Sequence, residues 1–98
     1  MANIGDFRNN EAEGRYELSV EGQLAVAAYD RREGALVFTH TQVPAALEGQ
    51  GVGSRLIGAA LADARAQNLK VVPLCEFVAA YIERHPQEQD LLAIDAPG

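Results

Sequence analysis

Three glycines stand at alternate positions directly before the most helix-like stretch of the sequence. The segment reads EGQGVGSR, from Glu48 to Arg55, and the apolar-periodic run LIGAALADARA follows it. Ordering glycine costs more backbone entropy than ordering any other residue, so this cluster needs a physical reason. Either a turn requires positive φ angles, or side chains are absent so that a ligand can reach the backbone. The rest of the sequence bears on this choice.

The residues that precede this segment alternate with the period of β-strands. Residues 15–20 place three apolar side chains on one face. They are Tyr16, Leu18 and Val20. Glu21 and Gly22 provide a two-residue turn, after which residues 23–31 resume the alternation. The apolar positions of this second strand are Leu24, Val26 and Ala28. Together the two strands predict a β-hairpin.

Two further strands flank this hairpin in the chain. ALVFTHTQV, residues 35–43, is rich in β-branched and aromatic residues and predicts a strand that folds back on the second. Pro44 ends this strand, because proline has no N–H group to donate to a sheet. IGDFRNN, residues 4–10, predicts a short edge strand.

A different period begins after residue 50. Apolar residues recur there at helical spacing, which predicts an amphipathic helix over residues 52–68. LKVVPL predicts a short strand that Pro73 interrupts, and CEFVAAYIERH predicts a second helix that Pro86 ends. QEQDLLAIDA adds one more turn. A meander followed by helix, strand and helix predicts an α+β (mixed α/β) fold.

Size and charge limit what this chain does. With 98 residues it holds one core, so we expect a single domain over residues 1–98 with its core at about 10–92. The net charge of −6 and the scattered Lys and Arg are unlike a nucleic-acid-binding surface. The sequence contains no stretch that resembles a membrane span or a signal peptide, so we expect a cytoplasmic location. One cysteine and two histidines give no metal-ligand pattern.

The start of the predicted long helix has the properties of an anion site. Unpaired backbone N–H groups and the positive end of the helix dipole meet there, and such a terminus binds phosphate. The P-loop does not fit, because Gly53-Ser54 lacks the lysine that the motif requires. The dinucleotide fingerprint does not fit either, because the glycines have another spacing and follow an antiparallel meander.

The segment EGQGVG, residues 48–53, resembles the pyrophosphate loop of the GNAT superfamily of acetyl-CoA-dependent N-acetyltransferases. That loop has the pattern Arg/Gln-x-x-Gly-x-Gly/Ala, which matches at Gly51 and Gly53 and departs at Glu48. Three further segments resemble short YjdJ-type domains of this superfamily: HTQVP, GSRLIGAALADARA and VVPLCEFVAAYIERHP. The resemblance covers nearly the whole chain. It implies a GNAT-like fold, in which an antiparallel β-meander is followed by helix, strand and helix and two parallel strands splay apart.

The resemblance implies acetyl-CoA (coenzyme A) as co-substrate and assigns its contacts. Backbone N–H groups would hold the pyrophosphate, and Arg55 would add positive charge from the first helical turn. These groups belong to Gln50, Gly51, Val52, Gly53 and Ser54. The pantetheine arm would lie between splayed strands at Thr39–Val43 and Lys70–Val72, where Thr41 and Val43 are candidate backbone contacts. The alternative is a plain turn before a capped helix.

Three residues are candidates for chemistry. Tyr81 aligns with the tyrosine by which many superfamily members protonate the coenzyme A sulfur, or else it is an amphipathic core residue. Cys75, where a strand gives way to a helix, is a candidate for a transient acetyl-cysteine, or else an inert buried thiol. His40 is a candidate base, or else a structural strand residue. Strand alternation predicts that His40 shares a face with Phe38, opposite Thr41.

Two functional interpretations follow from the resemblance. The first is an acetyl-CoA-dependent acyltransferase that moves acetyl to an amine, either a small amine or an amine on a protein. The second is a non-catalytic module that binds or senses acyl-CoA. An unliganded structural partner would leave the glycine segment unexplained. The acidic chain favours a cationic acceptor by charge. An uncovered face of the sheet is expected, consistent with a monomer or a weak homodimer.

Overall fold

The computed structural model describes residues 6–93, which form one five-stranded sheet with helices. The strands are β1 (Asp6–Asn10), β2 (Arg15–Val20), β3 (Gln23–Arg32), β4 (Ala35–Gln42) and β5 (Lys70–Pro73). They lie in the order β1-β2-β3-β4-β5, antiparallel except for the parallel pair β4–β5. The predicted mixed α/β class is therefore confirmed.

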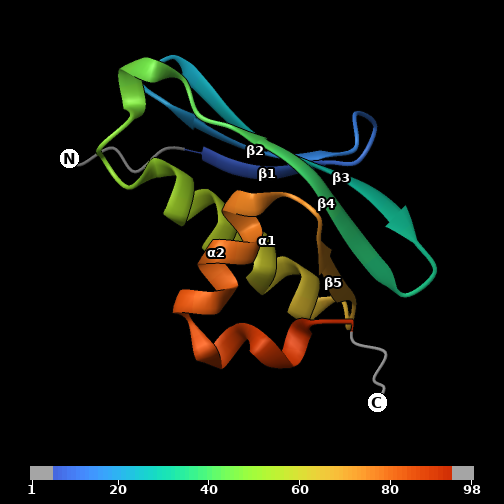
Figure 1. The fold of residues 1–98 in the computed structure, drawn as a ribbon. Helices are drawn as coiled ribbons and strands as arrows, with labels where there is room; N and C mark the ends of the chain where they lie inside the picture. The colour runs from blue at the N-terminus through green and yellow to red at the C-terminus, as the bar shows by residue number, and fades with distance from the viewer. Residues whose placement is uncertain (1–5, 94–98) are drawn as a thin grey trace.

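The helices form a second layer on one side of the sheet (Figure 1). The helical segments are η1 (Ala45–Leu47), α1 (Val52–Ala66), α2 (Glu76–Arg84) and η2 (Pro86–Leu91). The long helix α1 packs across the sheet and connects the two parallel strands, as a crossover of this kind requires. Between residues 6 and 93, none of the helices is long and apolar enough to cross a membrane.

Most predicted boundaries hold to within two residues. The helix α1 ends at Ala66 and not at Asn68, because Asn68 adopts a left-handed φ of 59° that no helix interior accepts. The extra turn expected after Pro86 is present as η2. The expected edge strand began at residue 4, and the expected final turn reached beyond residue 93, so their outer ends lie outside the described residues.

The β2–β3 turn decides which face of β3 is buried. Glu21 and Gly22 both have positive φ angles, of 51° and 80°, as a two-residue hairpin turn of the primed type requires. This turn pairs Leu18 with Ala25. Residues paired in this way share a face, so the inward residues of β3 are Ala25, Ala27 and Tyr29. Leu24, Val26 and Ala28, the alternating apolar positions of the sequence, therefore lie on the other face, because the hairpin register decides which face of β3 is buried.

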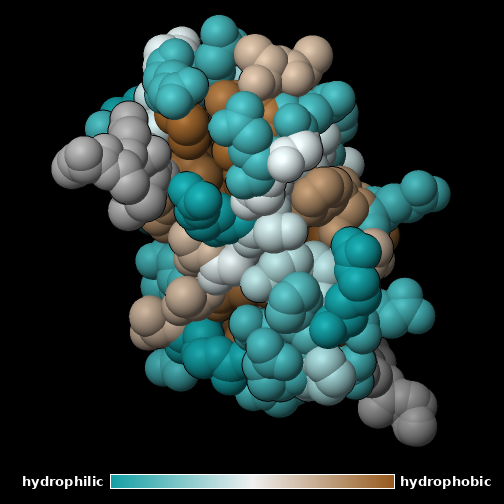
Figure 2. Space-filling view, turned by 90° about the vertical axis from the view of Figure 1, so that its left-hand side faces the viewer, coloured by the Kyte–Doolittle hydropathy of each residue, from teal (hydrophilic) through white to brown (hydrophobic). Residues whose placement is uncertain are grey.

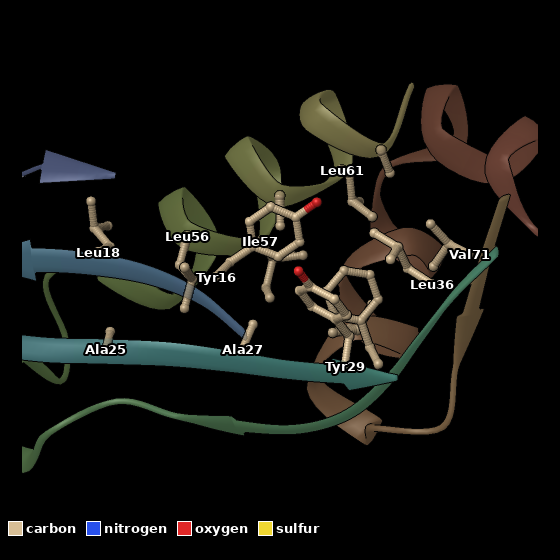
Figure 3. Close-up of a cluster of buried hydrophobic side chains, with 14 of the residues drawn as sticks. Tyr16, Leu18, Ala25, Ala27, Tyr29, Leu36, Leu56, Ile57, Leu61 and Val71 are labelled. Carbon is tan, nitrogen blue, oxygen red and sulfur yellow. The ribbon is translucent and has the colours of Figure 1, made fainter. Parts of the chain in front are cut away.

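The core lies between the sheet and α1 (Figure 3). Small side chains of β3 face the large side chains of the helix, which allows the helix to lie close to the sheet. The fully buried large residues include Tyr16, Phe38, Leu36, Leu56, Ile57, Leu61 and Val71. Burial of an aliphatic or aromatic side chain contributes about 1.5 to 3 kcal/mol. This layer holds the start of α1 in a fixed position against the end of β4.

A bulge interrupts β4 near its centre. Across the β3–β4 pair, Tyr29 is opposite Phe38, but the next residue of β3, Ala28, is opposite His40. Thr39 is therefore the additional residue of the bulge. An additional residue of this kind shifts the inward and outward alternation of a strand by one position.

The bulge corrects the predicted faces at the end of β4. Thr41 is opposite Ala27, a fully buried residue on the helix side of the sheet. Facing residues of an antiparallel pair point to the same side, so Thr41 joins Phe38 on the helix side. His40 lies on the other face and is exposed. The prediction that His40 shares a face with Phe38 is wrong, because simple alternation does not reveal a bulge.

The parallel strands are paired earlier in the chain than expected. Residues Ala35 to Phe38 are opposite Lys70 to Pro73, and β5 ends there. The last part of β4, from Thr39 to Gln42, continues without β5 beside it. The splayed segment of β4 is therefore close to the predicted Thr39–Val43. Lys70–Val72, its predicted partner in the splay, lies instead in the paired part of β5. The proline at the end of β5 explains the early separation, because it has no N–H group with which to continue the ladder.

Candidate active site

A groove of about 590 Å³ lies where the turn before α1 meets the end of β4. Its lining comes from β4, the turn, the first residues of α1 and the first turn of α2. The lining residues are Thr41, Gln42, Val43, Leu47, Glu48, Gly49, Gly51, Val52, Gly53, Ser54 and Phe77. Figure 2 views the molecule from the side on which this turn lies and shows hydrophobic surface recessed between hydrophilic side chains.

The three glycines of the segment have different structural reasons. Gly49 and Gly51 have φ angles of 84° and 76°, a region that other L-residues rarely adopt. Gly53 is not among the residues with positive φ. A Cβ atom at residue 53 would lie 2.5 Å from Cζ of Phe77, so the ring of Phe77 occupies the space of the missing side chain. Turn geometry explains two glycines, and helix packing explains the third.

The start of α1 presents backbone N–H groups to the groove. Within residues 6–93, no hydrogen-bond acceptor is found for the N–H groups of Gly51, Val52, Gly53 and Ser54. Gln50 differs, because its backbone N–H donates to the Leu47 carbonyl oxygen at 3.3 Å and its Nε2 donates to the Ala46 carbonyl oxygen at 3.1 Å. The structure therefore uses Gln50 to close the turn, and it leaves four of the five predicted amides available to an anion.

Two charged residues flank these amides. Glu48 lines the groove, so the one departure from the loop pattern places a carboxylate beside the candidate anion site. Arg55 is exposed in the first turn of α1, and its backbone N–H donates to the Gly51 carbonyl oxygen at 3.0 Å. Arg55 is not among the described residues that line the groove.

Cys75 is joined to the groove through Thr41. It is the N-cap residue of α2 and is partly buried. Its backbone N–H donates to the Phe38 carbonyl oxygen at 3.0 Å, which fixes the start of α2 to β4 at the point where β5 ends. Its Sγ lies 3.2 Å from Thr41 Oγ1, a hydrogen bond in which either atom can donate. The bulge in β4 makes this contact possible, because it turns Thr41 toward α2.

Tyr81 lies outside the groove. Its hydroxyl packs against α1, 2.9 Å from the position of a Cβ atom on Gly58, and its ring stacks on the His85 ring with centroids 3.9 Å apart. Burial, followed by the charge of Glu88, raises the pKa of Tyr81, so the phenol stays protonated at neutral pH. The structure does not bring Tyr81 to the described groove lining.

His40 also lies apart from the groove. It is exposed on the face of β4 that points away from the helices, opposite Ala28. Its predicted role as a base would need an acceptor that approaches from that face. The structure therefore brings Thr41, Val43 and the glycine turn together in one groove, and Thr41 connects Cys75 to it. Tyr81 and His40 both lie outside this groove.

Sequence reasoning missed two features of the site. Phe77 enters the groove from α2, and the side chain of Thr41, not only its backbone, contacts Cys75. A local signal existed for Phe77: it stands four residues before Tyr81, so both rings lie on one side of α2. No local signal shows that this side faces glycines of α1. That contact depends on how the two helices pack.

Comparison with known proteins identifies the fold. The sequence profile of the GCN5-related N-acetyl-transferase family matches residues 15–91. The chain belongs to this family. The match includes every candidate residue from β4, the glycine turn and α2. Membership of the GCN5-related family therefore assigns the chain to acyl transfer as its general class of chemistry.

A solved structure supports the same assignment. It is the NMR solution structure of a GCN5-like presumed N-acetyltransferase from Staphylococcus aureus, 28% identical to this chain. The alignment covers 94% of this chain and 90% of the other, with a TM-score of 0.71. No curated protein matches the sequence. In residues 6–93 there is no group of three or more His, Cys, Asp or Glu side chains that is arranged to hold a metal ion.

Proposed function

We propose that this protein is an acetyl-CoA-dependent N-acetyltransferase that moves an acetyl group to an amine. One observation carries the proposal. A single groove joins four unpaired backbone N–H groups at the start of α1 to Thr41, whose hydroxyl lies 3.2 Å from Cys75 Sγ. This arrangement supports an anion site in the groove and a nucleophile next to it, as an acyl thioester with a diphosphate tail requires.

The diphosphate of coenzyme A binds at the glycine turn. The N–H groups of Gly51 to Ser54 donate to its oxygens, and the dipole of the 15-residue helix α1 adds a partial positive charge. The pantetheine arm then lies along the end of β4, where Thr41 and Val43 line the groove. The backbone there has lost the neighbouring strand β5, so its polar groups are available to the amides of the arm.

The contact between Thr41 and Cys75 supports a covalent route. The Cys75 thiolate attacks the carbonyl carbon of the thioester, and the bond from that carbon to the coenzyme A sulfur breaks. The coenzyme A sulfur takes up the proton that the Cys75 thiol released, and coenzyme A leaves as the free thiol. A neutral amine then attacks the acetyl-cysteine, the carbon–sulfur bond to Cys75 breaks, and the amide product leaves. The proton lost by the amine nitrogen returns the Cys75 sulfur to the thiol. Because Cys75 is the N-cap residue of α2, the N–H groups of the first turn of this helix are candidates to stabilise the negative charge that develops on the reacting carbonyl.

Direct transfer from the thioester to the amine is the other route. It assigns Tyr81 as the acid for the sulfur and His40 as the base for the amine. Burial raises the pKa of Tyr81, which keeps the phenol protonated but makes it a weaker proton donor. Its hydroxyl also packs on α1 at Gly58, and His40 lies on the opposite face of the sheet. The covalent route therefore has the stronger support.

Intact mass spectrometry after incubation with acetyl-CoA tests the proposal. The covalent route predicts an adduct of about 42 Da, absent from Cys75→Ala and discharged by an added amine. Leu74→Ala is the matched control, because Leu74 is the exposed neighbour of Cys75 and does not line the groove. Amide formation by Cys75→Ala at the wild-type rate would contradict the covalent route. Undiminished turnover by Tyr81→Phe would exclude Tyr81 as the acid.

A non-catalytic acyl-CoA-binding or sensing module is the second candidate. The distance of both Tyr81 and His40 from the groove favours it, because a binding module needs neither residue. Calorimetry and a panel of amines separate the two functions. Binding of acetyl-CoA without amide formation from any amine indicates the module, whereas product that increases with time indicates the enzyme. The absence of binding at millimolar acetyl-CoA would contradict both.

A further inference from the structure

Phe77 is an exposed aromatic residue at the mouth of the groove. Its side chain is 41% exposed, although large apolar residues of this fold are otherwise mostly buried. Among the described residues of α2, it is the one that lines the groove. It stands two residues after Cys75, in the first turn of the helix. An aromatic ring placed in this way offers an apolar surface to whatever enters the groove.

The ring spans the starts of the two helices. It belongs to the first turn of α2, and its Cζ fills the position that a Cβ atom of Gly53 would occupy at the start of α1. The unpaired N–H groups of α1 therefore lie on one side of the ring, and Cys75 begins the helix that carries it. A ligand that extends from the α1 amides toward Cys75 is therefore expected to lie beside this ring.

The end of β4 also lines the groove. Thr41, Gln42 and Val43 line it there, together with the buried residues Leu47 and Val52. Between the amides and the thiol, the lining thus offers apolar side chains and backbone more than charges. Such a lining suits a flexible chain of methylene and amide groups better than it suits a second anion.

We propose that Phe77 is a specificity-determining residue, whose ring packs against the arm that joins the diphosphate to the thioester. The ring makes the groove prefer an acyl thioester with this arm over a nucleotide that lacks it. This inference rests on the proposed function, because it assumes that the α1 amides bind a diphosphate. It assigns the nucleotide end to the α1 amides and the arm to Phe77, so the two contributions are separable by experiment.

Calorimetry with two ligands separates these contributions. The ligands are coenzyme A and 3′-phospho-ADP, which is the nucleotide end of coenzyme A without the arm. Phe77→Ala is expected to weaken binding of coenzyme A by about tenfold, because it removes most of the apolar contact. Its binding of 3′-phospho-ADP is expected to stay within about twofold of the wild type, because the amides are unchanged. Phe77→Leu restores part of the apolar area. Its affinity for coenzyme A is therefore expected to lie between those of the wild type and Phe77→Ala.

Leu74→Ala is the matched control for loss of an exposed apolar side chain. Leu74 is 68% exposed, precedes α2 and lies outside the groove lining, so its removal is expected to leave the affinity for both ligands unchanged. Equal losses for both ligands in Phe77→Ala, or no loss for either, would overturn the role of Phe77. Wild-type protein that binds neither ligand would overturn the proposed function itself, and the two failures are therefore distinguishable.

An NMR titration gives a second measurement that needs no alanine variant. The chain has three phenylalanines, and Phe77→Leu identifies the ring resonances of Phe77. Coenzyme A is expected to shift these resonances clearly more than 3′-phospho-ADP does, because only coenzyme A carries the arm. Equal shifts with both ligands would contradict contact with the arm.

Discussion

The Tyr16 hydroxyl donates a hydrogen bond of 2.7 Å to Asp63 Oδ2 and so fastens β2 to α1. Tyr16 is fully buried, and the same carboxylate oxygen accepts a bond of 2.6 Å from Gln67 Nε2. We expect Tyr16→Phe to lower the free energy of unfolding by about 1 kcal/mol, measured by urea denaturation. A double-mutant cycle with Asp63→Ala is the control. The absence of coupling between the two changes would contradict the role of the bond.

Tyr16 is also expected to make the free energy of unfolding depend on pH in the alkaline range. Burial, and then the bond to Asp63, raise the pKa of the Tyr16 phenol far above its ordinary value of about 10. A folded-state pKa above the unfolded value stabilises the fold below pH 10, and this contribution declines as pH rises further. Tyr16→Phe is therefore expected to make the free energy of unfolding fall less steeply above pH 10. An unchanged slope would show that other groups control it.

Glu17 is expected to make the free energy of unfolding depend on pH in the acidic range. Hydrogen bonds from Arg15 first, and then from Arg8, lower the pKa of the Glu17 carboxyl from 4.5 to about 2, against an opposing effect of burial. This contribution to stability is complete above pH 4.5 and is lost as pH falls toward 2. Glu17→Gln is thus expected to destabilise the protein at pH 7 and to differ little from the wild type at pH 2. Glu33→Gln, at an exposed turn, is the control.

The effect of Gly58→Ala on the free energy of unfolding is expected to change sign with the residue at position 81. Replacing a helical glycine with alanine normally stabilises a helix by about 1 kcal/mol. Here the new Cβ atom would lie 2.9 Å from the Tyr81 hydroxyl oxygen but 3.8 Å from Cζ. Gly58→Ala is therefore expected to destabilise the wild type by about 1 kcal/mol and to stabilise Tyr81→Phe by about 0.5 to 1 kcal/mol. Equal effects in both backgrounds, measured by urea denaturation, would contradict the contact.

Glu48 is expected to weaken the binding of coenzyme A. Its carboxylate lies at the groove close to the candidate diphosphate site, so removal of the charge reduces repulsion. We expect Glu48→Gln to tighten binding about two- to fivefold at low salt, with a smaller effect at high salt. Calorimetry checks this, and Glu83→Gln on the exposed side of α2 is the control. Weaker binding by Glu48→Gln would indicate that the side chain itself holds the ligand.

Local patterns in the sequence predicted most of the fold. The alternation of Tyr16, Leu18 and Val20 is confirmed, and so is the helical period that begins at Val52, because these patterns report burial along a single element. The alternation of Leu24, Val26 and Ala28 did not reveal the inward face of β3. That face depends on the pairing of Leu18 with Ala25, which is a property of two strands and not of one.

The candidate site was less accessible to sequence reasoning, for the same physical reason. The glycine turn is a local feature and was found. The contact of Thr41 with Cys75 depends on a bulge, and that of Phe77 with Gly53 depends on helix packing. The amide of Gln50 was assigned to the ligand, but the 3₁₀ turn before α1 supplies its acceptor, Leu47. None of these arrangements produces a periodic pattern of residues in the sequence, so sequence patterns alone do not predict them.

The additional residue in β4 has a chemical consequence. Deletion of Thr39 would leave a regular strand in which His40 and Thr41 keep their present faces, whereas loss of the bulge with Thr39 retained would exchange them. In a strand of unbroken alternation with the present sequence, the imidazole of His40 and not the hydroxyl of Thr41 would face α2. A single step along the backbone therefore separates a cysteine with an alcohol beside it from a cysteine with a built-in proton acceptor.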